Sequence, residues 1–226
     1  MIVMRFLGAI SLALFLIFSG TTVLQPELAE ARGGKDKASE SDWTRLANLG
    51  GRALSVGDYK NAEAFFIQGL KAASLAFGDE SEPVAASVNN LGGLYMEQGL
   101  WEEAATRLKL ALSIRRKVLS NDDPKLANTL FNLGICSYNL DNLDAAEDLI
   151  RESLDIRTRI EGNEGISVAS ELLWLSRVYE GQLRYKEAEG CIDRSIAIYE
   201  KHLGPKSRET LKAKQKLNEL LEREAY

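Results

Sequence analysis

Three asparagines recur at one fixed interval: Asn48, Asn90 and Asn132 are separated by 42 residues each. A carboxamide carries two N–H donors and an acceptor oxygen, so it can satisfy both an N–H and a C=O of a peptide main chain. Three such side chains along one wall would hold an extended chain without demanding a particular side chain from it. The pattern therefore favours recognition of a polypeptide, provided that the fold brings the three residues into one row.

The residue types that catalysis needs are sparse. Imidazole-based catalysis needs a histidine beside a nucleophile, and the single histidine, His202, is expected at a helix end. Glu102 and Glu103 are adjacent, so they point apart on a helix and form no acid/base pair. Residues 121–124 lack the spaced oxygens and the glycine of a calcium loop, and the sequence has no Cys/His cluster and no Gly-rich phosphate loop. We expect no enzyme activity, no metal site and no cofactor.

Charge and composition narrow the class of partner. The chain has 226 residues, 45% of them hydrophobic, and a net charge of -5 with both signs interspersed. Because nucleic-acid binding requires a basic footprint, we expect no nucleic-acid partner. The basic cluster 115–117 is interpreted as a solvated helix end, where cations are favoured, with a phosphate or membrane-surface site as the alternative.

The N-terminal segment is typical of an export signal. One positive charge within residues 1–5 precedes an apolar run over 6–18, and the small-x-small triplet 29–31 offers a cleavage point before Arg32. Alternatively, residues 6–24 are long enough to stay as an uncleaved membrane anchor. We expect an extracytoplasmic protein, secreted or periplasmic, with a signal peptide or anchor over 1–31 and no membrane contact outside that segment.

A linker and two free cysteines are also predicted. Residues 32–41 are small and charged without apolar periodicity, which predicts a flexible linker. Cys136 and Cys191 fall at different phases of the 42-residue period, so they are expected on different helices. We therefore predict two free, largely buried thiols rather than a disulfide.

The 42-residue period extends to apolar positions. Such a period indicates one supersecondary unit that is copied and stacked. Within each copy, apolar residues at helical spacing predict two amphipathic helices joined by a short turn. Alanine recurs at Ala62, Ala104, Ala146 and Ala188, and leucine at Leu49, Leu91, Leu133, Leu175 and Leu217. The predicted helices cover 42–55, 59–76, 83–98, 101–119, 124–139, 143–161, 165–181, 185–202 and 206–224.

The sequence thus predicts an all-α fold, an α-α superhelix (solenoid) within a domain over 42–226. A period of 42 residues alone would also fit HEAT or armadillo units, so the positions inside the period decide. Leu91-Gly92 with Tyr95, followed by Ala104 with Leu108, resembles the tetratricopeptide repeat. The helix-turn-helix repeats are expected near 42–82, 83–123, 124–164 and 165–205, followed by a capping helix at 206–224.

The extra length of each unit resembles the kinesin light chain type of tetratricopeptide repeat. The match is close over residues 111–134 and looser over 195–205. The resemblance is specific for the fold and weakly specific for function. Because an export signal is unlike a cytoplasmic motor subunit, kinesin association and cargo transport are not carried over.

The resemblance implies a concave wall built from the first helices of the repeats, with an asparagine ladder that bonds a ligand main chain. Phe131, Leu173 and Trp174 are expected to form an apolar anchor, and Arg177 to receive an acidic side chain or a terminal carboxylate. The alternatives are solvated or unit-bridging asparagines and aromatic residues that serve the core. The candidate groove residues are Asn48, Asn89, Asn90, Asn128, Phe131, Asn132, Leu173, Trp174 and Arg177.

Together these expectations give one hypothesis and one alternative. The hypothesis is a non-enzymatic, exported scaffold that binds a peptide or protein segment in its concave groove and serves assembly of an envelope or membrane-associated complex. The alternative is a structural or oligomerisation module that uses the convex face or the helix edges and leaves the groove without a ligand.

Overall fold

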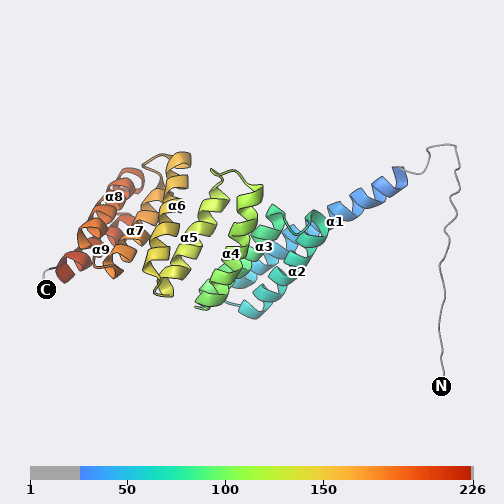
Figure 1. Cartoon of the computed structure of the whole chain (residues 1–226), viewed down its shortest axis with the longest axis horizontal. Coiled ribbons are helices and arrows are strands. Elements are labelled where there is room, and N and C mark those ends of the chain that lie inside the picture. Colours follow the sequence, from blue (N-terminus) through green and yellow to red (C-terminus); the bar gives the residue numbers. More distant parts are fainter. Residues whose placement is uncertain (1–25, 225–226) are drawn as a thin grey trace, which may run out of the picture.

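The structure is a computed structural model that describes residues 26–224, and within this range it contains helices joined by short turns and loops (Figure 1). The predicted export signal falls mostly on residues 1–25, which lie outside the described residues. The helices are α1 Pro26–Ser55, α2 Tyr59–Phe77, α3 Glu82–Glu97, α4 Trp101–Val118, α5 Pro124–Asn139, α6 Leu143–Glu161, α7 Ile166–Gly181, α8 Tyr185–Leu203 and α9 Arg208–Glu224.

The predicted all-α solenoid is confirmed, and α2 to α9 begin and end within two residues of their predicted bounds. The first helix differs. It begins at Pro26 rather than near residue 42, so residues 32–41, predicted as a linker, are helical in the structure and continue α1 away from the stack (Figure 1). Alanine, glutamate, lysine and arginine favour a helix here, whereas Gly33 and Gly34 each cost about 1 kcal/mol relative to alanine.

Side chains and glycines at the helix ends explain where the helices stop. The carboxylate of Asp58 accepts a hydrogen bond from the main-chain N–H of Asn61, and the Asn142 side chain accepts one from Ala145. Asp123 caps α5 in the same way, as its place before Pro124 predicts. At the other ends, helices stop at residues with positive φ, which glycine adopts at low cost. These are Gly78 at 81°, Gly162 at 79° and Gly204 at 88°.

Each helix packs against the next one in the chain, which gives a stack of helix pairs capped by α9 (Figure 1). The first helices of the repeats also contact one another, α1 with α3, α3 with α5 and α5 with α7. Within the described range the second helices, α2, α4, α6 and α8, make no comparable mutual contacts. The first helices therefore line the inner side of the stack, and the second helices form its outer side.

Small residues let the two helices of a unit approach closely. The recurring alanine of each second helix is fully buried. A Cβ on the recurring glycine of a first helix would overlap a side chain of its partner helix. That Cβ would lie 2.4 Å from Phe66 Cε1 at Gly50, 2.8 Å from Leu108 Cγ at Gly92 and 2.6 Å from Ile150 Cγ1 at Gly134.

A ladder of ion pairs runs along the edge that carries the loops between repeats. Each pair joins the end of a second helix to the loop before its own unit, and successive pairs occupy equivalent positions in successive repeats. All of these side chains are exposed, so each pair contributes little to stability. The three rungs are Lys117 with Glu80, Arg159 with Asp122 and Lys201 with Glu164.

Two further expectations can be compared with the described part of the chain. Both cysteines are free, Cys136 buried in α5 and Cys191 half-buried in α8, as predicted. None of the helices within residues 26–224 combines the length and the apolar character needed to span a bilayer.

Candidate functional site

The inner wall has a hollow near its C-terminal end. The hollow lies between α5, α7 and α9 and has a volume of about 370 Å³. Residues from these three helices line the hollow together. Their positions within the 42-residue period are therefore the ones that face the groove. The lining residues are Tyr138, Arg177, Glu180, Gly181, Lys216, Glu219 and Arg223.

A cluster of aromatic rings adjoins this hollow. The Trp174 indole of α7 meets two rings of α5 edge to face, Phe131 at 6.3 Å and 83° and Tyr138 at 6.0 Å and 81°. All three side chains are half-buried, so they pack together and still present ring surface to solvent. Leu173 is also half-buried but packs into the core beneath. The structure thus brings Phe131 and Trp174 together, with Tyr138 as their third member.

Arg177 supplies an uncommitted positive charge next to these rings. Its guanidinium lies 4.6 Å from the centre of the Trp174 ring, within the range of a cation–π contact. In the described part of the chain it forms no ion pair. The buried carboxylate of Glu180 is instead paired with Lys216 at 2.8 Å and with Arg223 at 3.5 Å. The hollow therefore offers Arg177 to an incoming carboxylate, whereas the other two cations are engaged.

The asparagine row lies on the first three inner helices. Asn48 on α1 is exposed, and Asn90 on α3 and Asn132 on α5 are half-buried. None of the three carboxamides has a hydrogen-bond partner among the described residues, so their donors and acceptors remain available. This is the state that capture of a ligand main chain requires.

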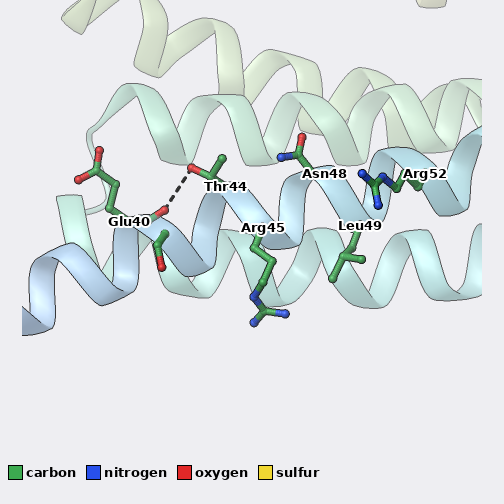
Figure 2. A pocket seen from close by; sticks show the side chains of 7 residues that line it. Glu40, Thr44, Arg45, Asn48, Leu49 and Arg52 are labelled. Carbon is green, nitrogen blue, oxygen red and sulfur yellow. Dashed lines mark hydrogen bonds between the residues drawn. The ribbon is translucent and has the colours of Figure 1, made fainter.

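The N-terminal end of the stack carries a larger hollow, of about 650 Å³, on α1 (Figure 2). There Thr44 Oγ1 donates a hydrogen bond of 3.2 Å to the main-chain oxygen of Glu40. The equivalent face of α3, α5 and α7 packs on the preceding second helix, so this hollow is an end face of the stack. It shares Asn48 with the asparagine row. The lining residues are Glu40, Ser41, Thr44, Arg45, Asn48, Leu49 and Arg52.

Two of the candidate asparagines are engaged in contacts between helices. Asn89 Oδ1 accepts hydrogen bonds from Arg115 Nη1 at 3.4 Å and from Thr129 Oγ1 at 3.3 Å. Asn128 Oδ1 accepts one from Arg157 Nη2. Both amides therefore connect a second helix to a first helix, which leaves the row Asn48, Asn90 and Asn132 as the uncommitted set.

The interpretation of residues 115–117 as a solvated cluster is wrong for Arg115. This residue is only 4% exposed, and its guanidinium donates to the main-chain oxygen of Lys125 at 2.9 Å and to the Thr129 hydroxyl. Burial lowers the pKa of Arg115, and Glu82 at 3.4 Å partly offsets that effect. The next residues, Arg116 and Lys117, are exposed as expected and pair with carboxylates. Helix-end charge statistics apply to all three residues alike and could not single out the one that turns inward.

A second buried ionisable group, Glu171 on α7, was also not identified from the sequence. This residue is 2% exposed, and its carboxyl accepts a hydrogen bond of 2.9 Å from Ser153 Oγ. Arg157 Nε lies 3.3 Å away. Burial is the largest influence on this carboxyl and raises its pKa to about 7. Its burial could have been inferred from its place within an apolar stripe, at the repeat position that Ser87 and Thr129 occupy in the preceding repeats.

Among the described residues, no group of three or more His, Cys, Asp or Glu side chains could hold a metal ion. His202 is exposed near the end of α8. The described side chains thus include an open asparagine row and an aromatic cluster beside Arg177.

Comparison with protein families gives matches to one repeat type. A family model described as Tetratricopeptide repeat matches residues 83–159, and a second model of the same description matches 175–209. The first covers α3 to α6 almost completely, and the second runs from the middle of α7 to the start of α9.

Solved structures with the same architecture are similar over most of this chain. The nearly identical TPR-like repeats of a protein described as a kinesin light chain of Podosopora anserina have a TM-score of 0.70 and 19% identity, over 80% of this chain and 86% of that one. BtubC (BKLC) from P. vanneervenii has a TM-score of 0.71 and 22% identity, over 86% and 83%. At these identities the likeness concerns the fold.

One curated relative is similar over a shorter stretch. It is a Clustered mitochondria protein homolog from Eremothecium gossypii, 27% identical over 134 residues. The alignment covers 59% of this chain but only 11% of that much longer protein.

Proposed function

We propose, from the premise that the chain is a tetratricopeptide repeat protein and hence a scaffold for protein–protein interaction, that it binds an extended peptide or protein segment along the inner wall of α1, α3, α5 and α7. The scaffold acts without catalysis, cofactor or nucleic acid. Its partner is a polypeptide whose main chain runs across the repeats.

One observation carries this proposal. The carboxamides of Asn90 and Asn132 have no partner in the described part of the chain, and they lie on the same wall as the cluster of Phe131, Trp174 and Tyr138. Donors and acceptors left open beside half-buried rings match what an extended peptide presents, a main chain with alternate side chains. A structural role would leave fewer of these groups unused.

The chemistry of the wall specifies the ligand further. The aromatic cluster accepts an apolar or aromatic side chain, and the free Arg177 next to it accepts a carboxylate. The carboxylate comes from an acidic side chain or from the ligand's C-terminus. The asparagine row holds the ligand main chain toward α3 and tolerates varied sequence there.

Export and assembly complete the proposal. The charged start and apolar run of residues 1–18 support export by a signal peptide or an anchor. A scaffold placed outside the cytoplasm by such a segment meets the proteins of the envelope. We infer that it serves assembly of an envelope or membrane-associated complex.

The test replaces two residues of the row, Asn90→Ala with Asn132→Ala, in the full chain. Partners are captured by affinity from the protein's own host and identified by mass spectrometry, and circular dichroism checks helicity. We expect loss of the captured partner with unchanged helicity, and the matched control Asn121→Ala, on an exposed loop outside the wall, should retain it. Retained capture by the double variant overturns the groove and favours docking on the convex face or the helix edges.

A further inference from the structure

We call the contact between the second helix of one repeat and the first helix of the next repeat a joint. One position of the 42-residue period lies inside each joint. At this position α3, α5 and α7 carry Ser87, Thr129 and Glu171, and all three side chains are buried. Two of them are hydroxyls, which stay neutral. The third is a carboxyl, so the joint between α6 and α7 alone among these three can change charge at this position.

The α4–α5 joint shows how a fixed joint is built. Arg115 fills it and bonds Lys125 O, Thr129 and Asn89, with Glu82 as its nearest carboxylate. A guanidinium stays protonated throughout the range in which proteins are folded. This joint therefore keeps one charge state at every working pH.

Among the described residues both joints leave one buried polar atom without a hydrogen-bond partner, Arg115 Nε in the α4–α5 joint and a Glu171 oxygen in the α6–α7 joint, but only the carboxyl can lose its charge. Glu171 Oε1 accepts from Ser153 at 2.9 Å and lies 3.3 Å from Arg157 Nε. Glu171 Oε2 is buried and has no hydrogen-bond partner within the described residues. Arg157 is shared, because it also pairs with Glu161 at 3.4 Å and donates to Asn128. One cation thus serves two carboxylates, and one buried oxygen is unsatisfied.

Among the side chains that the structure describes, the remaining surroundings of Glu171 add no second cation. From α6 the charged groups that act on it are Arg157 and Glu161. From α5 come the Asn128 amide and the carbonyl of Ala127, which lies 2.9 Å from Ser153 Oγ and competes with Glu171 for its one hydroxyl hydrogen. On the other side of α7, α8 contributes apolar contacts and Tyr199, whose hydroxyl interacts with Ser170.

We propose that the α6–α7 joint is a pH-responsive coupling between the third and fourth repeats, closed when Glu171 is protonated and loosened when it is ionised. An ionised carboxylate with one unsolvated oxygen is costly in a buried joint, and admission of water relieves that cost. Protonation removes the charge and lets α6 and α7 pack without water between them. The inference concerns the joint itself and does not depend on a groove ligand.

The titration of Glu171 supports this geometry. Burial raises its pKa from 4.5 to about 7. A carboxyl whose pKa is higher in the folded state stabilises the closed joint below its unfolded value, and this contribution is lost as pH rises through 7. Since each pKa unit is a factor of ten, opening that exposes Glu171 becomes easier on the order of a hundredfold between pH 5 and pH 8.

The aromatic cluster reports the state of the joint. Trp174 lies on α7, three residues after Glu171, and its two ring partners lie on α5. A shift of α7 relative to α5 changes these edge-to-face contacts. The emission of Trp174 should therefore follow the ionisation of Glu171.

The experiment uses the full chain with Trp43→Phe and Trp101→Phe, which leaves Trp174 as its only tryptophan. Its emission is recorded from pH 5 to pH 9, alone and with Glu171→Gln. We expect a transition near pH 7 that disappears in the Gln variant. The hydrogen-exchange rate of the α7 amides is divided by the rate of the same amides in the Glu171→Gln variant. This ratio should rise on the order of a hundredfold over the same pH range.

Three matched variants separate this joint from other titrating groups. His202→Gln and Glu152→Gln each remove an ionisable group outside the joint and should leave the transition in place. Glu161→Gln releases Arg157 to Glu171 and should move the transition to lower pH. A transition that survives Glu171→Gln, or a wild-type signal that stays flat with constant exchange ratio, overturns the proposal.

Discussion

The indole nitrogen of Trp43 on α1 donates a hydrogen bond of 2.8 Å to Ser87 Oγ on α3, 44 residues farther along the chain. Ser87 also donates to the main-chain oxygen of Pro83 at 2.9 Å, so its hydroxyl is engaged twice. This bond ties the first helix of the first repeat directly to the first helix of the second. It gives the N-terminal joint a polar link in place of the buried arginine of the α4–α5 joint.

Replacing Trp43 by Phe should cost about 1 kcal/mol, since it removes this hydrogen bond and keeps an aromatic ring at this half-buried position. Ser87→Ala measures the other partner, and the double variant closes a thermodynamic cycle by urea unfolding. We expect a coupling energy of at least about 0.5 kcal/mol. Strictly additive effects would show that the bond does not contribute to stability.

Two glycines in helices should respond to alanine in opposite directions. At Gly134 a Cβ would lie 2.6 Å from Ile150 Cγ1, so Gly134→Ala should destabilise the fold by about 1–3 kcal/mol. At Gly190 a Cβ meets nothing within 4 Å, so Gly190→Ala should stabilise it by about 0.5–1 kcal/mol. Thermal unfolding of both variants compares them. A stabilised Gly134→Ala protein would contradict the close approach of α5 and α6.

Leu183 is a leucine in a left-handed conformation, with φ of 60° and a side chain that is 71% exposed. Three other repeats have Gly57, Gly99 and Asp141 at this position, all with positive φ. Because asparagine tolerates this region and little apolar contact is lost, Leu183→Asn should raise stability by about 0.5–1 kcal/mol. Leu140→Asn, at a turn residue with φ of -91°, is the control and should not raise it.

Consecutive arginines provide a matched pair for the buried joint. Arg115→Met removes the buried guanidinium that donates to the Thr129 hydroxyl and the Lys125 carbonyl and that pairs with Glu82, and it should cost about 2–4 kcal/mol. Arg116→Met removes only an exposed pair with Glu152 and should cost less than about 1 kcal/mol. Chemical denaturation of both proteins gives the comparison. Equal losses would mean that burial of Arg115 has no energetic consequence.

The helices and their order could be predicted because they follow from period, helical spacing and end signals. The recurring glycine and alanine positions indicate which helices meet, and Asp123-Pro124 marks where α5 begins. These signals are local or repeat with the chain. A stacked fold depends on little else, since each unit contacts only its neighbours.

The roles of individual polar residues could be predicted only in part. Asn89 and Asn90 are adjacent, yet the first bonds Arg115 and Thr129 while the second is uncommitted. Arg115 and Glu171 turn inward at phases where other repeats carry Ala73 and Ser87. Such choices depend on which partner the neighbouring helix offers, and a single period of the sequence does not contain that information.

The ladder on the loop edge has a consequence for how such a chain can change over evolutionary time. Each rung, such as Arg159 with Asp122, uses groups that are separated by less than one unit and recur with it. Duplication or loss of one unit in the gene therefore carries its rung along and leaves the others matched. The reach of the scaffold can lengthen or shorten by recombination, without new compensating charges at the site of the change.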